Sequence, residues 1–477
     1  MKKFGLFNIS VFGLLSTLSA QRVASEPNII YILADDLGYG DIGCYGQKQI
    51  KTPRIDNLAA NGMLFTQHYA GSSVSAPSRS SLLTGLHTGH TFIRGNKDFG
   101  KIGEGQYPLP AETFTLAKML KNAGYVTGAF GKWGLGPANT DGDPANMGFD
   151  EFYGYNCQRL AHNYYPYFLY QNKDKVFLQG NDGIKTEQFA PDIIQQEALK
   201  FIANNAAKKF FLYLPYILPH AELCSPNDSI FAMYKGVLTN GTPYKGVDSG
   251  EGYKMGDYGS SVQPHADFAA MVTRLDTYVG QVVDALQRLG IEKNTIIIFT
   301  SDNGPHIEGG ADPSYFQSNG TMRGLKRDLY EGGIKVPMIA YWPEKIKAGT
   351  KNDDVSAFWD VLPTFKSIIG NKSKITTDGI SFLPTLLGKN KQKQHKSLYW
   401  EFHEEGGKVA VRKGKWKGIK LNYDQNPTGE MLLFDLSTDV HEDKNVAAEN
   451  PKIVAQMEKI IQKEHIKSSI FNFEWEK

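Results

Sequence analysis

A potential nucleophile, a helix start and a fixed cation lie within one stretch, Ser75-Ala76-Pro77-Ser78-Arg79. Such a combination suggests a site that binds an anion. Pro77 suits the opening turn of a helix, where its missing amide proton costs nothing, and the leucines that follow give that helix an apolar side. Ser75 is therefore expected just before a helix N-terminus, where free amides and the helix dipole favour anions. Arg79, one turn later, adds a planar fork of donors that suits sulfate or phosphate. The same pattern is also typical of an ordinary capped helix start, so both interpretations stand at this point.

Two pairs of oxygen-bearing side chains follow apolar runs elsewhere in the chain. Asp35 and Asp36 come directly after the run 28–34. Asp302 and Asn303 follow a second run of the same kind. No Cys or His accompanies the two pairs, so the donor set suits Ca²⁺ or Mg²⁺ rather than zinc. Either pair alone is also a common turn signal, and it is their joint presence with the serine motif that favours a metal site.

Four short apolar runs, each followed by a polar cluster, define the expected sheet. The runs span residues 28–34, 125–130, 210–214 and 295–300. Because such runs are typical of strands buried on both faces, we predict an α/β fold with a large, mostly parallel sheet sandwiched by helices. The polar clusters would then meet at the carboxyl ends of the strands, where open α/β sheets bind their ligands.

Helical periodicity predicts the elements that cover this sheet. The clearest apolar stripe runs over 268–286 and would leave Arg274 and Asp276 on the solvent side. Residues 115–123 and 357–369 are expected to form further covering helices.

The hydrophobic pattern changes after about residue 379. Short runs of alternating apolar and polar residues replace the continuous apolar runs and helical stripes found earlier in the chain. Runs at 398–402, 408–416 and 431–436 predict an antiparallel sheet with turns at glycines. The pair Asn450-Pro451 then predicts the start of a closing helix. The fold class therefore includes a smaller C-terminal antiparallel sheet plus a helix.

The N-terminus has the pattern of a cleavable export signal. Two lysines precede an apolar run over 4–18, which is followed by small residues. The run is shorter than the roughly 20 residues of a membrane span, so we expect no stable membrane insertion and a periplasmic or secreted protein. Three cysteines are too few for a disulfide framework. The predicted domains are a signal peptide, 1–20, a catalytic domain, 26–385, and a C-terminal α+β subdomain, 386–477.

The charge balance bears on the class of partner. The chain carries 52 basic and 50 acidic residues, so it has no strong net charge. This balance argues against a dominant nucleic-acid role, since such a role normally requires a basic surface, and no nucleic acid is predicted as a partner.

Several motifs occur in a fixed order and together resemble the signature of the formylglycine-dependent sulfatases. Ser-x-Pro-Ser-Arg is followed by Leu-x-Thr-Gly, and a serine in the first position makes the chain similar to the serine-type members of that family. The match covers nearly the whole mature chain, and several separated motifs in one order are far more specific than any one alone. The further matching motifs are Asp35-Asp36, Gly131-Lys132-Trp133, Pro219-His220, Ser301-Asp302-Asn303-Gly304, Gly324-Leu325-Lys326 and Leu433-Phe434-Asp435-Leu436.

The resemblance implies the alkaline-phosphatase-like sulfatase fold and a particular chemistry. It implies that a serine-type maturase, acting as a partner protein, oxidises Ser75 to formylglycine. In the implied mechanism the aldehyde is hydrated, one hydroxyl attacks sulfur, the alcohol leaves, and the aldehyde re-forms as sulfate is ejected. One Ca²⁺ ion is the implied cofactor, and its implied ligands are Asp35, Asp36, Ser75, Asp302 and Asn303.

Four charged or titratable residues fall inside the matching motifs. By the resemblance, Arg79 steadies the hydrated aldehyde, while Lys132 and Lys326 supply positive charge to the sulfate oxygens. His220 matches the family histidine near the leaving-group oxygen and is the expected general acid.

One position departs from the family pattern. Many relatives have a second active-site histidine where this chain has Gly134. Either another group takes over proton removal from the hydrated aldehyde, or this subgroup works without it, or the enzyme is impaired. His306 is a candidate for that role, and a structural cap is the other interpretation of it.

A sulfated carbohydrate is the predicted substrate class, because an exported enzyme with polar, aromatic-rich surroundings meets such polymers. Segments 158–165 and 401–404 have the composition of a sugar-binding rim, but equally that of packed loops. The first alternative function is a phosphomonoester or phosphonate hydrolase that uses Ser75 directly, although Asn303 stands where such an enzyme is expected to have a metal-binding histidine. The second is a non-catalytic glycan- or anion-binding protein on the sulfatase scaffold.

Overall fold

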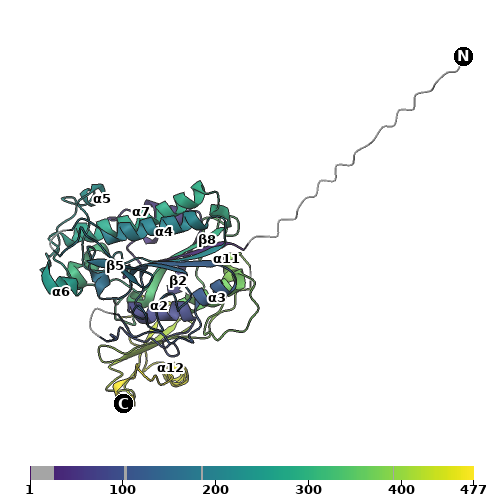
Figure 1. Ribbon diagram of the computed structural model, residues 1–477. Coiled ribbons are helices and arrows are strands. Elements are labelled where there is room, and N and C mark those ends of the chain that lie inside the picture. The colour runs from purple at the N-terminus through teal and green to yellow at the C-terminus, as the bar shows by residue number, and fades with distance from the viewer. Residues whose placement is uncertain (2–25, 101–104, 184–185, 390) are drawn as a thin grey trace.

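The computed structural model describes residue 1 and residues 26–100, 105–183, 186–389 and 391–477. The predicted signal peptide, 1–20, lies outside the described residues apart from its first residue. Within the described residues the chain forms one large sheet between two layers of helices and a second, smaller sheet (Figure 1).

The large sheet has eleven strands, and its centre is parallel. Strands β8, β1, β7, β3 and β4 run parallel to one another, while β9, β5 and β6 join antiparallel to them or to each other toward the two sides. The strand order is β10-β2-β9-β8-β1-β7-β3-β4-β5-β6, with β11 paired to β2. The strands span β1 Asn28–Ala34, β2 Met63–Tyr69, β3 Val126–Lys132, β4 Glu151–Tyr155, β5 Phe168–Gln171, β6 Asp174–Phe177, β7 Phe210–Pro215, β8 Thr295–Ser301, β9 Lys335–Tyr341, β10 Thr350–Asn352 and β11 Ser356–Ala357.

The four predicted apolar runs are β1, β3, β7 and β8, and every residue of β1, β7 and β8 is buried. Burial on both faces explains why these strands are continuously apolar rather than alternating. The predicted fold class is confirmed.

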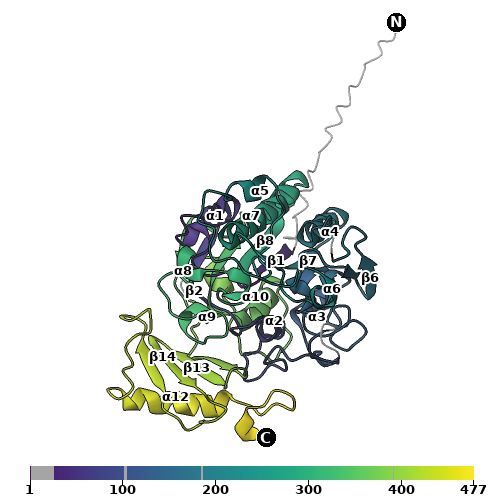
Figure 2. The same ribbon diagram turned by 90° about the vertical axis from the view of Figure 1, so that its left-hand side faces the viewer.

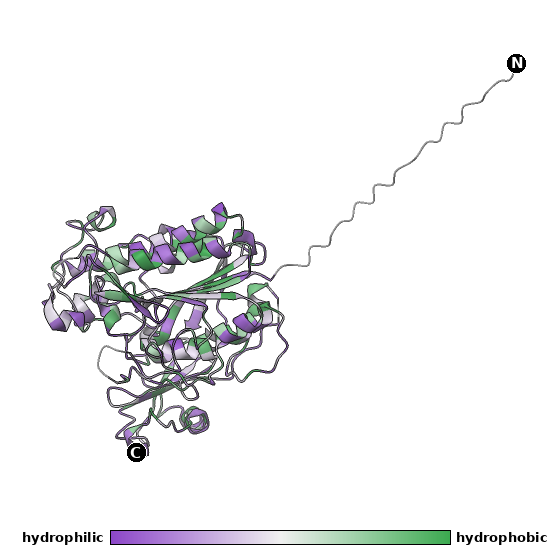
Figure 3. Cartoon of the chain, viewed as in Figure 1, coloured by the Kyte–Doolittle hydropathy of each residue, from purple (hydrophilic) through white to green (hydrophobic). Residues whose placement is uncertain are grey.

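Helices cover both faces of the large sheet. Figure 1 shows α4 and α7 on one face and α2 and α3 on the other, and Figure 3 shows apolar and polar residues sharing the surface of the long helices, as amphipathic helices require. The helices of this domain are α1 Pro53–Ala60, α2 Ser75–Thr84, α3 Leu116–Asn122, α4 Ala190–Asn205, α5 Ser229–Ala232, α6 Gly250–Lys254, α7 Pro264–Arg288, α8 Pro313–Phe316, α9 Glu331–Ile334, α10 Val361–Ile368 and α11 Leu383–Leu386.

The prediction that Arg274 and Asp276 of α7 face solvent is wrong. Both are buried, with exposed fractions of 5% and 2%. Arg274 forms ion pairs with Asp192 and Asp228, and Asp276 accepts a hydrogen bond from the amide of Ile55. These partners lie in separate elements packed over the helix, and periodicity along the helix carries no signal of them.

The C-terminal part of the chain forms the predicted antiparallel sheet and helix beside the main body (Figure 2). One face of this sheet packs with Trp359 and Tyr69 of the large domain, and the other packs with α12. The subdomain is therefore held between a shared apolar interface and its own helix. Its elements are β12 Leu398–Phe402, β13 Lys408–Lys413, β14 Trp416–Leu421, β15 Leu432–Asp435 and α12 Pro451–Glu464.

Across the described residues, every helix is too short or too polar to cross a lipid bilayer.

Candidate active site

The two acidic pairs meet at the carboxyl ends of neighbouring parallel strands. Strands β1 and β8 pair in register through Ala34 and Ser301, so the residues that follow them are adjacent. The amide of Asp36 donates a hydrogen bond to Oδ1 of Asp302 at 3.1 Å. Asp36 has a φ of 61°, a left-handed conformation that is uncommon for a residue with a side chain. The turn after β1 is thus shaped by the carboxylate that follows β8.

Ser75 begins helix α2 and points at this pair. Its Oγ donates a hydrogen bond to Oδ1 of Asp35 at 3.0 Å, and the residue is only 2% exposed. Beside it, Oδ1 of Asn96 accepts a hydrogen bond from the amide of Ala76 at 3.1 Å. Asn96 was not singled out in the sequence, because no local pattern shows that it folds back onto the helix start.

Two buried cations, Arg79 and Lys132, bind the carboxylates of Asp302 and Asp35. Arg79 donates to Oδ2 of Asp302 through Nε at 3.0 Å and Nη2 at 2.8 Å, and its Nη2 lies 3.3 Å from Asp35. Lys132, at the end of β3, donates to Oδ2 of Asp35 at 2.6 Å. Arg79 also donates to the carbonyl of Lys132 at 2.6 Å, which ties the helix to the strand end.

A third cation and a histidine face Asp36. Nζ of Lys326 donates to Oδ2 of Asp36 at 2.8 Å and lies 3.2 Å from Nε2 of His220. Nε2 of His220 is itself 3.4 Å from Asp36 Oδ2. Glu308, which the sequence did not indicate, lies 3.7 Å from Lys326 and also pairs with Arg327. All the predicted site residues are therefore gathered in one buried cluster.

Burial and charge shift several pKa values in this cluster. Burial alone would raise the pKa of Asp35, but the charge of Lys132, followed by His220 and Arg79, lowers it well below its usual range. Burial and then the charge of Asp35 raise the pKa of Asp302 to about 7. Burial, with the charges of Lys326 and Lys132, lowers the pKa of His220 well below its ordinary value.

The side chain of Asn303 supplies the test of whether a cation fits. Its Nδ2 donates to Oδ1 of Asp36 at 2.6 Å and to the carbonyl of Gly304, which directs the other amide atom away from these partners. That atom, Oδ1, is buried without a hydrogen-bond partner among the described residues. A buried acceptor without a partner costs about 1–3 kcal/mol, so it is normally satisfied by a bound group. With the neighbouring carboxylates it forms an all-oxygen donor set, and this set fits a hard divalent cation.

His306 lies behind His220 rather than beside Ser75. Its ring stacks on His220 with centroids 5.8 Å apart. Nε2 is 3.1 Å from the carbonyl of Pro219, and Nδ1 is 3.2 Å from Oε2 of Glu308. Burial alone would lower the pKa of His306, but the hydrogen bond with Glu308 raises it. With both ring nitrogens engaged, the structural interpretation of His306 is the one that its contacts favour.

Gly134 has no room for a side chain. Its φ is 74°, and a Cβ placed there would lie 2.1 Å from Nε2 of Gln158. The amide of Gln158 thus fills the space beside the end of β3, and its Nε2 is buried without a partner among the described residues. The sequence shows the missing histidine but not the glutamine that occupies its space.

The two predicted rim segments differ. Segment 158–165 passes the site, and His162 stacks on His220 with centroids 5.2 Å apart. In segment 401–404, by contrast, Glu401 is fully buried and pairs with Arg94 and with histidines of its own subdomain. Glu404 of the same segment accepts a hydrogen bond from the amide of Asn96 at 2.8 Å, beside the start of α2, so only the Glu401 end is packed and the rim interpretation of the segment stays a prediction.

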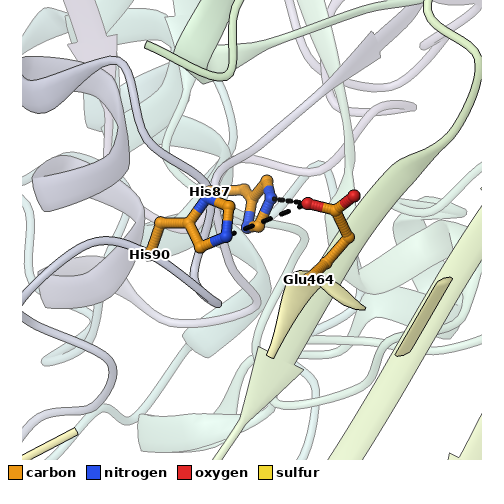
Figure 4. Close-up of side chains that lie close together, drawn as sticks. All are labelled: His87, His90 and Glu464. Carbon is orange, nitrogen blue, oxygen red and sulfur yellow. Dashed lines mark hydrogen bonds and ion pairs between the residues drawn. The ribbon is translucent and has the colours of Figure 1, made fainter. Parts of the chain in front are cut away.

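A second group of metal-ligating side chains lies between the two domains (Figure 4). His87 and His90 follow α2, and Glu464 ends α12. Nδ1 of His87 accepts the amide of Gly89 at 3.1 Å, so its proton is on Nε2, 3.3 Å from Glu464 Oε2. The two rings are in contact, with centroids 4.1 Å apart and planes tilted by 30°. This group, with Asp378 bonded to His90 at 2.8 Å, is a hydrogen-bonded joint rather than a metal site.

Comparisons with known proteins agree with this geometry. The family model described as Sulfatase matches residues 27–370, and the model described as N-sulphoglucosamine sulphohydrolase, C-terminal, matches residues 325–467. Human steryl-sulfatase is 31% identical over an alignment that covers 87% of this chain and 79% of that protein. An N-acetylgalactosamine-6-O-sulfatase from Bacteroides thetaiotaomicron is 29% identical, with 92% and 93% covered.

Solved structures give the same result. The crystal structure of Ps i-CgsB in complex with k-i-k-neocarrahexaose has a TM-score of 0.78 and 28% identity, covering 95% of this chain and 96% of that one. A phosphonate monoester hydrolase of Agrobacterium radiobacter, at a TM-score of 0.64 and 20% identity, shares the fold. With a family model matching most of its length, the chain belongs to the sulfatase family and is a sulfuric ester hydrolase.

Proposed function

We propose that the protein hydrolyses sulfate esters of carbohydrates, using a formylglycine formed from Ser75 and one bound Ca²⁺ ion. The observation that carries this proposal is the buried Ser75 hydroxyl at the start of α2, bonded to Asp35 and surrounded by Arg79 and Lys132. A carbohydrate is favoured because one relative is named an N-acetylgalactosamine-6-O-sulfatase and one solved neighbour holds a neocarrahexaose.

The calcium site would be formed by Asp35, Asp36, Asp302, Asn303 and the modified side chain at position 75. The unpartnered Oδ1 of Asn303 and the clustered carboxylates support this ligand set. When bound, the ion would polarise an oxygen of the residue-75 group and help neutralise the sulfate. The formylglycine would supply a hydrated aldehyde as a stronger nucleophile than a serine hydroxyl.

The buried cations would hold the sulfate and the nucleophile in place. Arg79 is fixed by its bonds to Asp302 and to the carbonyl of Lys132, so it has no rotational freedom to lose when substrate binds. Lys132 and Lys326 approach from two sides, through Asp35 and Asp36. Preorganised charges of this kind stabilise the charge that develops on the sulfuryl oxygens.

Proton delivery to the leaving alcohol would involve His220 together with Lys326. Because Nδ1 of His220 faces the carbonyl of Ala221, that nitrogen carries a proton, and the lone pair on Nε2 faces the Lys326 ammonium at 3.2 Å. The lowered pKa of His220 agrees with a neutral imidazole before substrate arrives. We infer that the Lys326 ammonium gives a proton to the lone pair of His220 Nε2 and that Nε2 then gives this proton to the departing alkoxide oxygen, which leaves Lys326 as a neutral amine and His220 neutral.

The proposed biology has two further parts. A serine-type maturase would be needed to oxidise Ser75, because the unmodified hydroxyl is a weak nucleophile. Export to the periplasm or beyond, through the predicted signal peptide, would bring the enzyme to sulfated polymers. The domain boundary near residue 385 is retained as a prediction.

Mass spectrometry of the Ser75 peptide tests the central claim. Protein produced with a serine-type maturase should show a loss of about 2 Da at Ser75, and its sulfate release should rise with the modified fraction. An unmodified serine in fully active protein would overturn the mechanism. Turnover of phosphonate esters in preference to sulfate esters would instead support the phosphonate hydrolase alternative, and binding without turnover by modified protein would support the binding-protein alternative.

A further inference from the structure

A wall of aromatic side chains stands beside His220, on the side away from His306. His162, the last residue of a short 3₁₀ turn (Leu160–His162), stacks on His220 with ring planes only 15° apart. Tyr258 packs against His162 with centroids 4.5 Å apart. Both residues are partly exposed, unlike the buried residues around Ser75. The wall therefore faces outward from the position assigned to the leaving group.

Two loops from distant parts of the sequence are bonded together to form this wall. Arg159 forms an ion pair with Asp257 and donates to the carbonyl of Met255 at 2.7 Å. Nδ2 of Asn163 donates to the carbonyl of Asp257 at 2.9 Å. These bonds lie on both sides of His162 along the chain, so its position is fixed before any ligand binds.

The buried carboxylate of Glu222 binds both loops. Glu222 accepts hydrogen bonds from the amide of Tyr164 at 3.0 Å, the amide of Gly259 at 2.7 Å and the hydroxyl of Tyr253 at 3.1 Å. One side chain thus joins the segment that carries His162 to the segment that carries Tyr258. The wall is a built element of the structure, and not a chance contact between two surface loops.

The hydrogen bonding of His162 determines what it can bind. Its Nδ1 is 2.8 Å from the carbonyl of Gly256, so the ring proton must be on Nδ1. No hydrogen bond reaches Nε2 from any residue that the structure describes, which leaves a lone pair available. Burial and the charges of Lys132 and Lys326 lower the pKa of His162 to about 3, so the ring stays a neutral acceptor.

An acceptor of this kind repels sulfate oxygens and attracts a donor. The group that approaches Nε2 must therefore belong to the part of the substrate that carries an O–H. We propose that His162 and Tyr258 form a sugar-binding subsite, in which Nε2 of His162 accepts a hydrogen bond from a ring hydroxyl of the sulfated sugar. The face of Tyr258 is the apolar surface on which the sugar ring would rest.

The inference rests on the proposed function and makes it more specific. A steryl or aryl leaving group has no sugar ring, so it offers no ring hydroxyl to Nε2 of His162. A sugar satisfies it, and sites built to bind a hydroxyl discriminate strongly against analogues that lack one. His162 would thus select carbohydrate sulfates over aryl sulfates.

The test compares three substrates in the wild type and two variants. N-acetylgalactosamine 6-sulfate, its 4-O-methyl analogue and 4-nitrophenyl sulfate would be assayed with wild type, His162→Phe and His162→Gln. Phe keeps a stacking ring without an acceptor, whereas Gln keeps an acceptor oxygen. We expect His162→Phe to lower the ratio of kcat/KM for the sugar over the aryl sulfate by about 10- to 100-fold, and His162→Gln to restore part of that ratio.

The methyl analogue checks the contact directly. If the 4-hydroxyl is the donor, its methylation should lower wild-type kcat/KM and have little further effect in His162→Phe. A 3-O-methyl analogue tests the 3-hydroxyl in the same way. The exposed His441 provides a matched control, since His441→Phe should change neither substrate. An unchanged ratio in His162→Phe, with melting temperature preserved, overturns the proposal.

Binding separates this inference from the proposed function. Inactivity of the wild type toward every sulfate would count against the hydrolase, but Ser75→Ala protein could still be titrated with the sugar sulfate by calorimetry. His162→Phe in that background should weaken binding about 10-fold or more. Equal affinity in the two proteins would overturn the subsite whatever the fate of the hydrolase.

Discussion

Two clusters among the described residues bring potential metal ligands together. They differ in whether their acceptor atoms already receive hydrogen bonds from neighbouring side chains. At the strand ends, Asn303 has a buried oxygen to which no described residue donates a hydrogen bond, beside an aspartate whose pKa is raised to about 7. Between the domains, His87 and His90 direct their protons at Glu464 and Asp378. The first cluster therefore keeps an acceptor that no described residue hydrogen-bonds, beside its lysine and arginine side chains, whereas the second is satisfied by its own protons. Side chains that lie close together form a metal site only if their acceptor atoms are not already hydrogen-bonded to other groups of the protein.

The largest expected effect is loss of the residue-75 side chain. Ser75→Ala should abolish sulfate release, by a factor of about 10³ or more, because no nucleophile or precursor of one remains. Sulfate release would be measured by ion chromatography, with the exposed Ser437→Ala as control. Substantial activity in Ser75→Ala would remove Ser75 from the mechanism, provided that both proteins melt at the same temperature.

Metal content tests the two clusters directly. Asp302→Ala should lower calcium content and activity together, since it removes both a donor oxygen and the partner of Arg79. His90→Phe, the matched variant in the other cluster, should keep the wild-type calcium content, and elemental analysis of both should find no stoichiometric zinc. One zinc per chain that is lost in His90→Phe would reverse our assignment of the second cluster.

Gly134 sharpens the description of the first cluster. Gly134→Ala should lower activity by about 10-fold and stability by about 1–3 kcal/mol, because the new Cβ meets Gln158 in a backbone conformation that favours glycine. Kinetics and denaturant melts would measure the two effects. Adding Gln158→Ser should recover part of the lost activity, and no recovery would mean that the strain is in the backbone alone.

The smallest effect is expected at the joint between the domains. Hydrogen bonding from His87 lowers the pKa of Glu464 to about 2, below its ordinary 4.5. A lowered folded-state pKa stabilises the protein above the ordinary value, and this contribution is lost as pH falls toward 2. Glu464→Gln should therefore lower the melting temperature by about 1–2 °C at pH 7 and by less at pH 3. A difference that is independent of pH would contradict the assignment of the lowered Glu464 pKa to this hydrogen bond.

Much of the fold could be predicted because its signals are local. The continuously apolar composition of the runs that form β1, β3, β7 and β8 predicts that these strands are buried. The pair Asn450-Pro451 likewise predicts the start of α12. The solvent-facing assignment of Arg274 and Asp276 failed because their partners come from other elements. Helical periodicity describes one element at a time and cannot show a buried ion pair between several.

The residues of the site also fall into those that local motifs predict and those that only the tertiary structure shows. Motif residues such as Ser75 and Asp302 could be assigned in advance, while Asn96 and Gln158 could not, because they reach the site through loops of no distinctive pattern. The segments 158–165 and 401–404 have similar compositions, yet His162 is partly exposed beside His220 whereas Glu401 is fully buried. Composition reports which groups are available, and the packing of the loops decides which of them are exposed.

The sequence by itself determined the chemistry that is available here: a serine at a helix start, hard oxygen donors after two buried strands, and the cations that accompany them. Only the tertiary structure decided that Asn303 keeps an unpartnered oxygen, that Gln158 fills the space beside Gly134, and that His162 presents a neutral acceptor next to His220. The physical reason is that residue type fixes what a group can donate or accept. Whether that capacity is already used depends on neighbours far away in the chain.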